Sequence, residues 1–209
     1  MRDDYKVTDR AYLARCRGWI IEGRKAGLFY AAFELKCFLE AKLGEYLENW
    51  EGRPLKKVQV HRIKDNVKSL AKQNTMPDIV RMVFTNEIGL SETYFHTPVP
   101  VPLIDYATKT LDGLRHAQTR YRKPDDIWWQ ETRNALIENY RRAWFASRGT
   151  APVPPLWRPE DGRGEMPFTF LFPDDEPPSQ LFEDSKPGDS YNVEISYLDE
   201  PPRDWVCDL

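Results

Sequence analysis

The chain has 209 residues, of which 41% are hydrophobic and 13% aromatic, so it can bury a core and general disorder is excluded. Its three cysteines, Cys16, Cys37 and Cys207, are too few and too widely spaced for a disulfide framework or a zinc site. No apolar run approaches the roughly 20 residues that span a bilayer, and the charged N-terminus lacks the apolar core of a signal peptide. We therefore expect a cytoplasmic protein in a reducing compartment, with no membrane partner.

The net charge of −3 divides into two parts of opposite sign. Residues 174–209 hold eleven acidic side chains against Lys186 and Arg203, so this part carries −9 and residues 1–173 carry +6. Such asymmetry fits a nucleic-acid surface beside a tail that competes for it. It fits equally a solvated tail that keeps the protein soluble.

The spacing of apolar residues predicts a bundle of about five helices within residues 1–148. Thr8 and Asp9 suit the N-cap of the first helix, and the strongest i, i+3, i+4, i+7 stripe follows in the second. The expected ranges are 10–25, 26–51, 55–73, 77–86 as a short segment, 104–123 and 124–145. On the second helix, the polar residues Glu34, Lys36, Glu40, Lys42, Glu45 and Glu48 are expected mostly on the outer face.

Prolines and glycines mark the breaks between these elements. Pro77 suits the first turn of the short helix, and the run from Pro98 to Pro102 predicts a stiff connector. Pro124 begins the last helix, with two acidic residues in its first turn, and Gly149 closes it.

A proline-rich acidic extension is predicted over residues 149–209. Within it, 167–172 and 191–197 are β-prone runs that could pair as a short hairpin. An isolated hairpin is marginally stable in water, so we expect it to pack on the helices or on another chain. The predicted fold class is therefore mainly α: a basic bundle at 1–148 and an extension containing a β hairpin.

Histidine is the usual side chain for acid–base chemistry near neutral pH, and the most interesting of the three is His116. Several cations surround it in the sequence and could hold a phosphate backbone: Lys109, Arg115, Arg120, Arg122 and Lys123. The alternative is a helical histidine that packs between cationic neighbours. No metal-ligand spacing and no phosphate-binding glycine loop occur, so neither a metal nor a cofactor is expected.

Two segments resemble the HEPN class of small prokaryotic helical domains. They are Gly23-Arg-Lys-Ala-Gly-Leu-Phe-Tyr-Ala-Ala-Phe-Glu-Leu-Lys36 and Leu111-Asp-Gly-Leu-Arg-His-Ala-Gln118, the latter before a Trp-rich helix. The resemblance covers residues 10–146 and implies an up-and-down bundle of four or five helices that often forms homodimers. It also implies roles in toxin–antitoxin, antiviral or RNA-processing systems. Active HEPN members are metal-independent ribonucleases that use an Arg, four to six further residues and a His.

The chain departs from this pattern before His116. The arginine should fall at 109, 110 or 111, where the chain has Lys109, Thr110 and Leu111. Lysine lacks the planar fork with which arginine grips phosphate. The resemblance thus favours a non-catalytic interaction module, a subunit of a prokaryotic defence or toxin–antitoxin complex that binds a protein partner or a second copy of itself. The alternative is a ribonuclease in which His116 acts with neighbouring cations on RNA.

Overall fold

The computed structural model describes residues 5–51, 54, 65, 79–115, 121–152, 179–183 and 189–209. The chain divides into two compact units. The helical unit comprises Met1–Asn74, Val99–Ser147 and Trp205–Leu209, and the sheet unit comprises Thr75–Pro98 and Arg148–Asp204. This division differs from the predicted boundary at 148, because residues on both sides of it enter the sheet unit and the last five residues belong with the helices.

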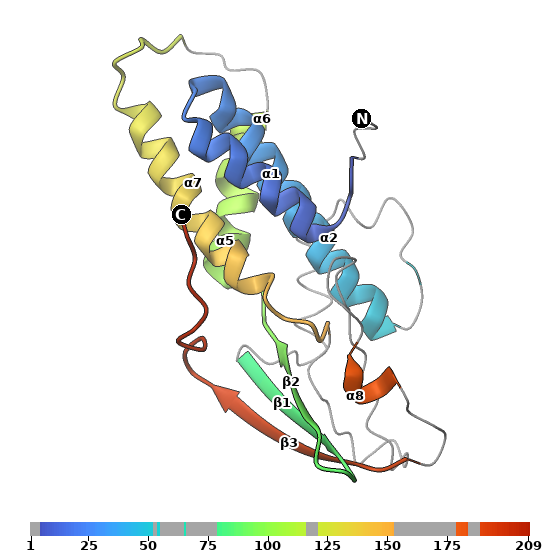
Figure 1. Ribbon diagram of the computed structural model, residues 1–209. Helices are drawn as coiled ribbons and strands as arrows, with labels where there is room; N and C mark the ends of the chain where they lie inside the picture. The colour runs from blue at the N-terminus through green and yellow to red at the C-terminus, as the bar shows by residue number, and fades with distance from the viewer. Residues whose placement is uncertain are drawn as a thin grey trace. The chain divides into compact units, whose positions relative to one another are not determined.

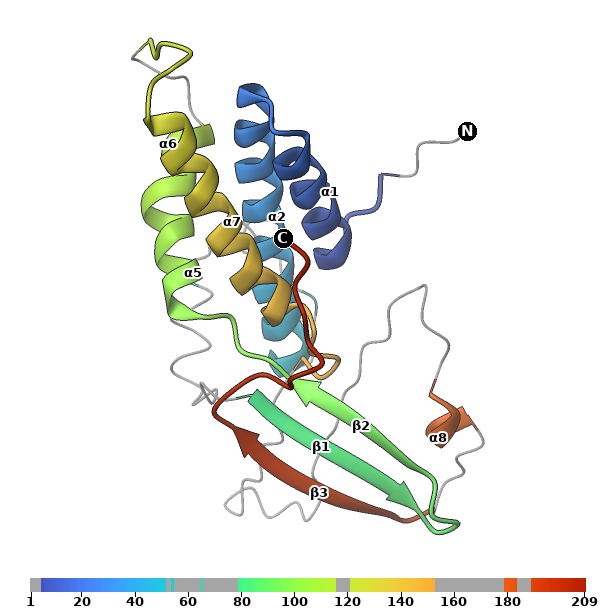
Figure 2. The same cartoon turned by 60° about the vertical axis from the view of Figure 1, so that its left-hand side comes forward.

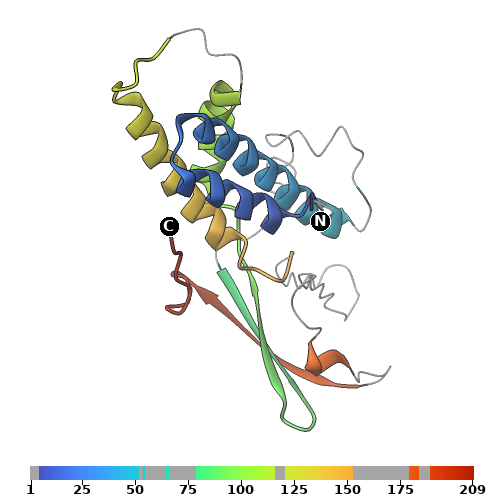
Figure 3. The same ribbon diagram turned by 45° about the horizontal axis from the view of Figure 1, so that its top comes forward.

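Two long helices at the N-terminus pack against each other along their length (Figures 1 and 3). Helix α1 (Asp9–Glu22) begins as predicted at Thr8, whose hydroxyl accepts a hydrogen bond from the Ala11 amide at 3.2 Å. It ends at Gly23, whose φ of 73° lies in the left-handed region that glycine tolerates best. Helix α2 (Lys25–Glu51) follows at once.

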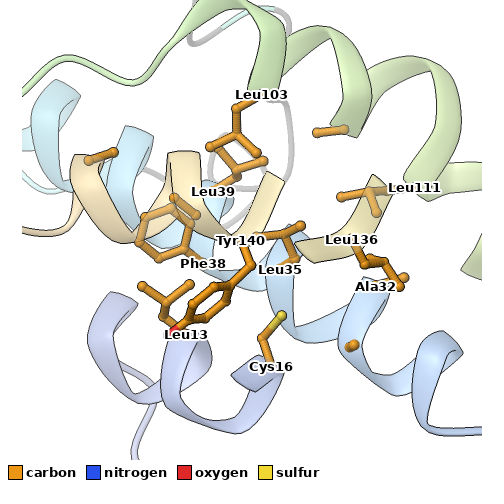
Figure 4. Packing of buried hydrophobic residues seen from close by; sticks show 14 of the residues in the cluster. Leu13, Cys16, Ala32, Leu35, Phe38, Leu39, Leu103, Leu111, Leu136 and Tyr140 are labelled. Atoms are coloured by element: carbon orange, nitrogen blue, oxygen red, sulfur yellow. The ribbon is translucent and has the colours of Figure 1, made fainter. Parts of the chain in front are cut away.

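The remaining helices of this unit surround α2 (Figure 2). Helix α5 (Val101–Tyr106) continues through a π-helical turn (Ala107–Leu111) into α6 (Asp112–Arg115), and α7 (Trp128–Ala146) packs against α1 and α2. Their buried side chains form one core. Figure 4 shows its centre, with Leu13, Cys16, Ala32, Leu35, Phe38, Leu39, Leu103, Leu111, Leu136 and Tyr140. Among the described helices, none is both long and apolar enough to cross a membrane.

The sheet unit is built on three antiparallel strands with β1 in the centre (Figure 2). The strands are β1 (Ile79–Asn86), β2 (Ser91–His96) and β3 (Tyr191–Leu198), in the order β2-β1-β3. A turn with Gly89 at φ 84° joins β1 to β2. One face is apolar and packs on the short helix α8 (Gln180–Glu183), with Val80, Met82, Phe84, Tyr94, Ala151 and Leu181 buried.

The predicted helix at 77–86 is wrong, because residues 79–86 form strand β1. Its apolar residues also alternate with period two: Val80, Met82 and Phe84 are buried, and Arg81 between them is exposed. A short apolar run fits both the helical period of 3.6 residues and the strand period of two. Pairing with β2 and β3 makes this segment a strand.

The predicted hairpin is corrected in part. Residues 191–198 are a strand, but their partner is β1, more than 100 residues earlier in the chain. The other expected arm, 167–172, lies outside the described residues, as does the expected helix at 55–73 apart from Asp65. The described part is therefore helix-rich, with a small antiparallel sheet, and its sheet replaces one element of the expected five-helix bundle.

Candidate functional site

The residues proposed for RNA chemistry are only partly described. His116 and Arg120 lie outside the described residues, and of Arg115 only the backbone is described, as the last residue of α6. Lys109 lies in the π-helical turn, exposed, with its ammonium 3.0 Å from the Asp105 carboxylate one turn earlier. Such a pair is solvated and leaves Lys109 accessible.

Arg122 and Lys123 lie just before α7. The Arg122 guanidinium carbon stands 3.9 Å from the ring centroid of Trp128, and the Lys123 carbonyl accepts a hydrogen bond from the Trp129 indole at 2.9 Å. Lys25 approaches from α2 and lies 5.4 Å from the Trp129 ring. These contacts fix the start of α7. Lys109 pairs with Asp105 and Arg122 packs on Trp128, so each of the two cations has a different described neighbour.

A second group of residues, on α1, on α2 and in the segment before α1, is aromatic and either exposed or half-buried. We call it the aromatic surface and define it as Tyr5, Tyr12, Trp19, Tyr30 and Phe33. The rings of Trp19 and Tyr30 lie 4.8 Å apart, and Phe33 follows Tyr30 by one helical turn. Tyr30 is 55% exposed and Phe33 is 44% exposed.

An ion pair lies within the aromatic surface. The Nε of Arg15 donates to the Glu34 carboxylate at 3.0 Å, and Glu34 is buried. The Arg15 guanidinium lies 4.0 Å from the Tyr5 ring and 4.8 Å from the Tyr12 ring, so the two rings cover it. Its Nη1 also donates to the Lys6 carbonyl at 2.9 Å. Arg15 therefore anchors the N-terminal segment on α1 and α2 and holds the Tyr5 and Tyr12 rings in place.

Two titratable groups near this surface have raised pKa values. Burial raises the pKa of Tyr12, and nearby Cys37 and Tyr5 add to the effect against the opposing charge of Arg15. Burial also raises the pKa of the Cys16 thiol. Both groups remain protonated at neutral pH, and a protonated thiol is a poor nucleophile.

A buried polar cluster joins the first turn of α1 to α2. The Lys42 ammonium lies 3.3 Å from Asp9 and 3.5 Å from Glu45. Burial alone would lower the pKa of Lys42, but Tyr46, Glu45 and Asp9 outweigh it and the pKa is raised. Through its pair with Asp9, the Lys42 ammonium links α2 to the first turn of α1.

Among the residues that the structure describes, no group of three or more His, Cys, Asp or Glu side chains could hold a metal ion. Comparison with protein-family models, with curated proteins and with solved structures gives no match. The site is therefore judged on its geometry.

Sequence reasoning missed the aromatic surface and misplaced two charged residues. Glu34 and Lys42 were expected mostly on the outer face of α2, but both are buried, because α2 is the central helix and packs on several sides. A signal was present in the sequence: Tyr12 and Trp19 are seven residues apart, and Tyr30 and Phe33 are three apart. Both spacings place aromatic rings on one side of a helix.

Proposed function

We propose that the chain is a non-catalytic interaction module whose helical unit binds a protein partner through the aromatic surface. The observation that carries the proposal is the exposure of Tyr30 and Phe33 beside Trp19, on two helices that pack together. Tyrosine, tryptophan and arginine dominate the binding energy of protein interfaces, because they bury large rigid areas and still form hydrogen bonds. Large aromatic side chains gathered on a protein's surface commonly mark such sites.

The internal order of this surface supports the same proposal. Arg15 is held by Glu34 and by the Lys6 carbonyl, so the neighbouring rings lose little conformational freedom when a partner binds. A setting in a prokaryotic defence or toxin–antitoxin complex is proposed from the HEPN resemblance of residues 23–36 and 111–118. The partner is a different protein or a second copy.

The test compares two substitutions with a matched control. The double variant Tyr30→Ser/Phe33→Ser removes the two exposed rings that α2 contributes to this surface, and Tyr121→Ser removes an aromatic residue that is 82% exposed elsewhere in the helical unit. Light scattering after size exclusion measures self-association, and affinity capture from the native host followed by mass spectrometry measures a foreign partner. We expect the partner to be lost by the double variant and retained by Tyr121→Ser.

A partner retained equally by all three proteins would refute the assignment of this surface. A wild-type chain that is monomeric and captures nothing would refute the interaction module itself.

A second candidate is the metal-independent ribonuclease that acts through His116. Arg122 and Lys123 lie beside exposed Tyr121, and a ring flanked by cations suits an unpaired base and its phosphates. The candidate predicts cleavage of a mixed-sequence RNA in EDTA at low salt, lost in His116→Ala. It also predicts weaker RNA binding in Tyr121→Ser and unchanged binding in Tyr30→Ser/Phe33→Ser. Cleavage that survives His116→Ala would remove it.

A further inference from the structure

The two edges of the three-stranded sheet are treated differently. At the β2 edge, the Phe95 carbonyl accepts hydrogen bonds from the amides of Thr150 and Ala151, each at 2.9 Å. The Gly149 amide donates to the Thr97 hydroxyl just beyond the strand. At the other edge, within the described part of the chain, β3 pairs with β1 alone (Figure 2).

The register identifies which backbone groups of β3 point outward. The backbone carbonyl of Phe95 points away from β1, so Phe95 and Arg81 form a pair without hydrogen bonds between them. The backbone groups of Arg81 therefore point toward β3, where Arg81 faces Ser196. Alternation along the strands then directs the amides and carbonyls of Ser196, Glu194 and Asn192 toward β1. The outward set is Tyr191, Val193, Ile195 and Tyr197.

Within the described part of the chain, the β3 edge carries little of the usual protection against strand addition, with Glu194 as the one charged side chain in the strand. Natural edge strands carry prolines, lysines or bulges, or are very short. The strand Tyr191–Leu198 runs for eight residues, contains no proline, lysine or glycine, and pairs with β1 without a bulge. Pro201 and Pro202 follow it, and their missing amides end the stretch that can accept another strand.

The charge along this edge is acidic. Glu194 lies in the strand, and Asp199 and Glu200 follow it, all three exposed and without an ion-pair partner among the described residues. On the opposite face of the strand, Val193 and Ile195 are half-buried and Tyr197 is 53% exposed. The strand thus offers the Glu194 carboxylate on one face and apolar side chains on the other, with two further carboxylates just beyond its end.

We infer that β3 accepts an extended basic segment of a partner protein as a fourth strand of the sheet. The segment bonds to the outward backbone groups of Tyr191, Val193, Ile195 and Tyr197. Its residues alternate, with lysine or arginine on the side of Glu194 and apolar side chains beside Val193 and Tyr197. A second copy of β3 is disfavoured, because it would gather six carboxylates along one pairing with no basic residue in either strand.

This inference goes beyond the proposed function and does not rest on it, since the aromatic surface belongs to the helical unit and the β3 edge to the sheet unit. A chain that binds nothing through Tyr30 and Phe33 could still accept a strand at β3. The two are separated by using the full chain with variants at either place.

The probe is a fluorescent eight-residue peptide of alternating valine and lysine, with blocked ends, titrated into the full chain while its anisotropy is measured. Tyr197→Pro removes one outward amide, and Tyr197→Ala shortens the same exposed side chain while keeping the amide. We expect saturable binding that is weakened at least about tenfold by Tyr197→Pro and less than about threefold by Tyr197→Ala, because a lost main-chain bond leaves a polar group of the peptide unpaired. Circular dichroism checks that both variants fold.

Further arms test charge and backbone pairing. Glu194→Gln should weaken binding by up to about fivefold, as expected for one cross-strand charge pair. Two further peptides carry N-methyl groups on every second amide, one on the odd-numbered and one on the even-numbered residues. Only one of the two should bind, because only one keeps the amides that face β3 free. The double variant Tyr30→Ser/Phe33→Ser should bind the peptide as the wild type does.

Three results would overturn the inference. They are no saturable binding up to about 1 mM peptide, equal affinity of Tyr197→Pro and Tyr197→Ala, or indifference to N-methylation, which would indicate charge attraction without strand pairing. Dimerisation of the peptide-free chain that Tyr197→Pro abolishes would make a second copy the occupant and would equally overturn the basic partner.

Discussion

The ammonium of Lys42 lies 3.3 Å from a carboxylate oxygen of Asp9, which ties the interior of α2 to the first turn of α1. Only 3% of the Lys42 side chain is exposed, and Glu45 supplies a second carboxylate at 3.5 Å. A buried cation with two partners is costly to disrupt, because its removal leaves carboxylates partly desolvated without compensation. This relationship gives the first prediction.

Lys42→Met should lower the free energy of unfolding by about 2 to 3 kcal/mol, since it removes the charge but nearly preserves the volume. Lys109→Met is the control: Lys109 has an acidic partner at 3.0 Å, but both groups are exposed, and the expected loss is below about 0.5 kcal/mol. Urea unfolding followed by circular dichroism measures both. Equal losses would show that burial of the Lys42 pair does not matter.

The second prediction concerns alkaline pH. Burial raises the pKa of Tyr140 above its ordinary value of 10.0, so the native chain keeps this proton after the unfolded chain has lost it. The stability that this group contributes is complete below about pH 10 and falls as the pH rises further. Tyr140→Phe, which cannot ionise, should therefore flatten the decline in unfolding free energy between about pH 9 and pH 11, the range around the ordinary tyrosine pKa.

Tyr121→Phe provides the control for this pH dependence. Its ring is 82% exposed, so this variant measures what the removal of a tyrosine hydroxyl from the surface does to the slope. A slope that Tyr140→Phe leaves as steep as in the wild type would mean that other groups cause the alkaline loss.

The elements that the sequence predicted well are those whose signals are local. Helix α1 carries its cap at Thr8 and α7 carries an amphipathic pattern, so both were expected within a few residues of their observed bounds. Strand β1 was missed because its partner β3 lies more than 100 residues later, and no local pattern encodes that pairing. The burial of Glu34 was missed for a similar reason, since Arg15 reaches it from another helix.

The site was less predictable than the fold. The cations around His116 were chosen because they are close in sequence, but Lys109 pairs with Asp105 and Arg122 packs on Trp128. The aromatic surface depends on α1 and α2 lying side by side, which brings Trp19 against Tyr30. Helix pairing of this kind follows from tertiary packing and not from spacing along one helix.

The third prediction concerns the last five residues, Trp205–Leu209, which belong to the helical unit. Cys207 and Leu209 pack against its core, and Asp208 forms a two-bond ion pair with Arg17 of α1. Deleting residues 205–209 should reduce stability by about 1 to 2 kcal/mol, because half-buried apolar area is lost. Hydrogen exchange should locate the loss in α1 and α7.

Asp208→Asn separates the ion pair from the apolar contacts. The ion pair of Arg17 and Asp208 is exposed to solvent, and the substitution leaves the apolar contacts of the segment intact. This variant should therefore resemble the wild type in hydrogen exchange of α1. If Asp208→Asn reproduced the whole effect of the deletion, the apolar contacts of Cys207 and Leu209 would not be what holds this segment.

The last prediction distinguishes two glycines. A Cβ added at Gly149 would lie 2.4 Å from the Thr97 hydroxyl and 2.8 Å from the Thr97 amide, so the closeness of two backbone segments requires glycine there. The sequence pattern had explained Gly149 only as the end of a helix. Gly149→Ala should therefore cost about 1 to 3 kcal/mol through overpacking and should weaken the hydrogen bond from the residue 149 amide to Thr97.

Gly113 lies in α6 and a Cβ there would meet nothing within 4 Å. Gly113→Ala should consequently raise stability by up to about 1 kcal/mol, because alanine loses less backbone entropy in a helix than glycine does. If contact with Thr97 is what requires Gly149, chemical denaturation should show a lower free energy of unfolding for Gly149→Ala and a higher one for Gly113→Ala. If Gly149→Ala were neutral or stabilising, the end of β2 would have room for a Cβ that the 2.4 Å approach to Thr97 denies it.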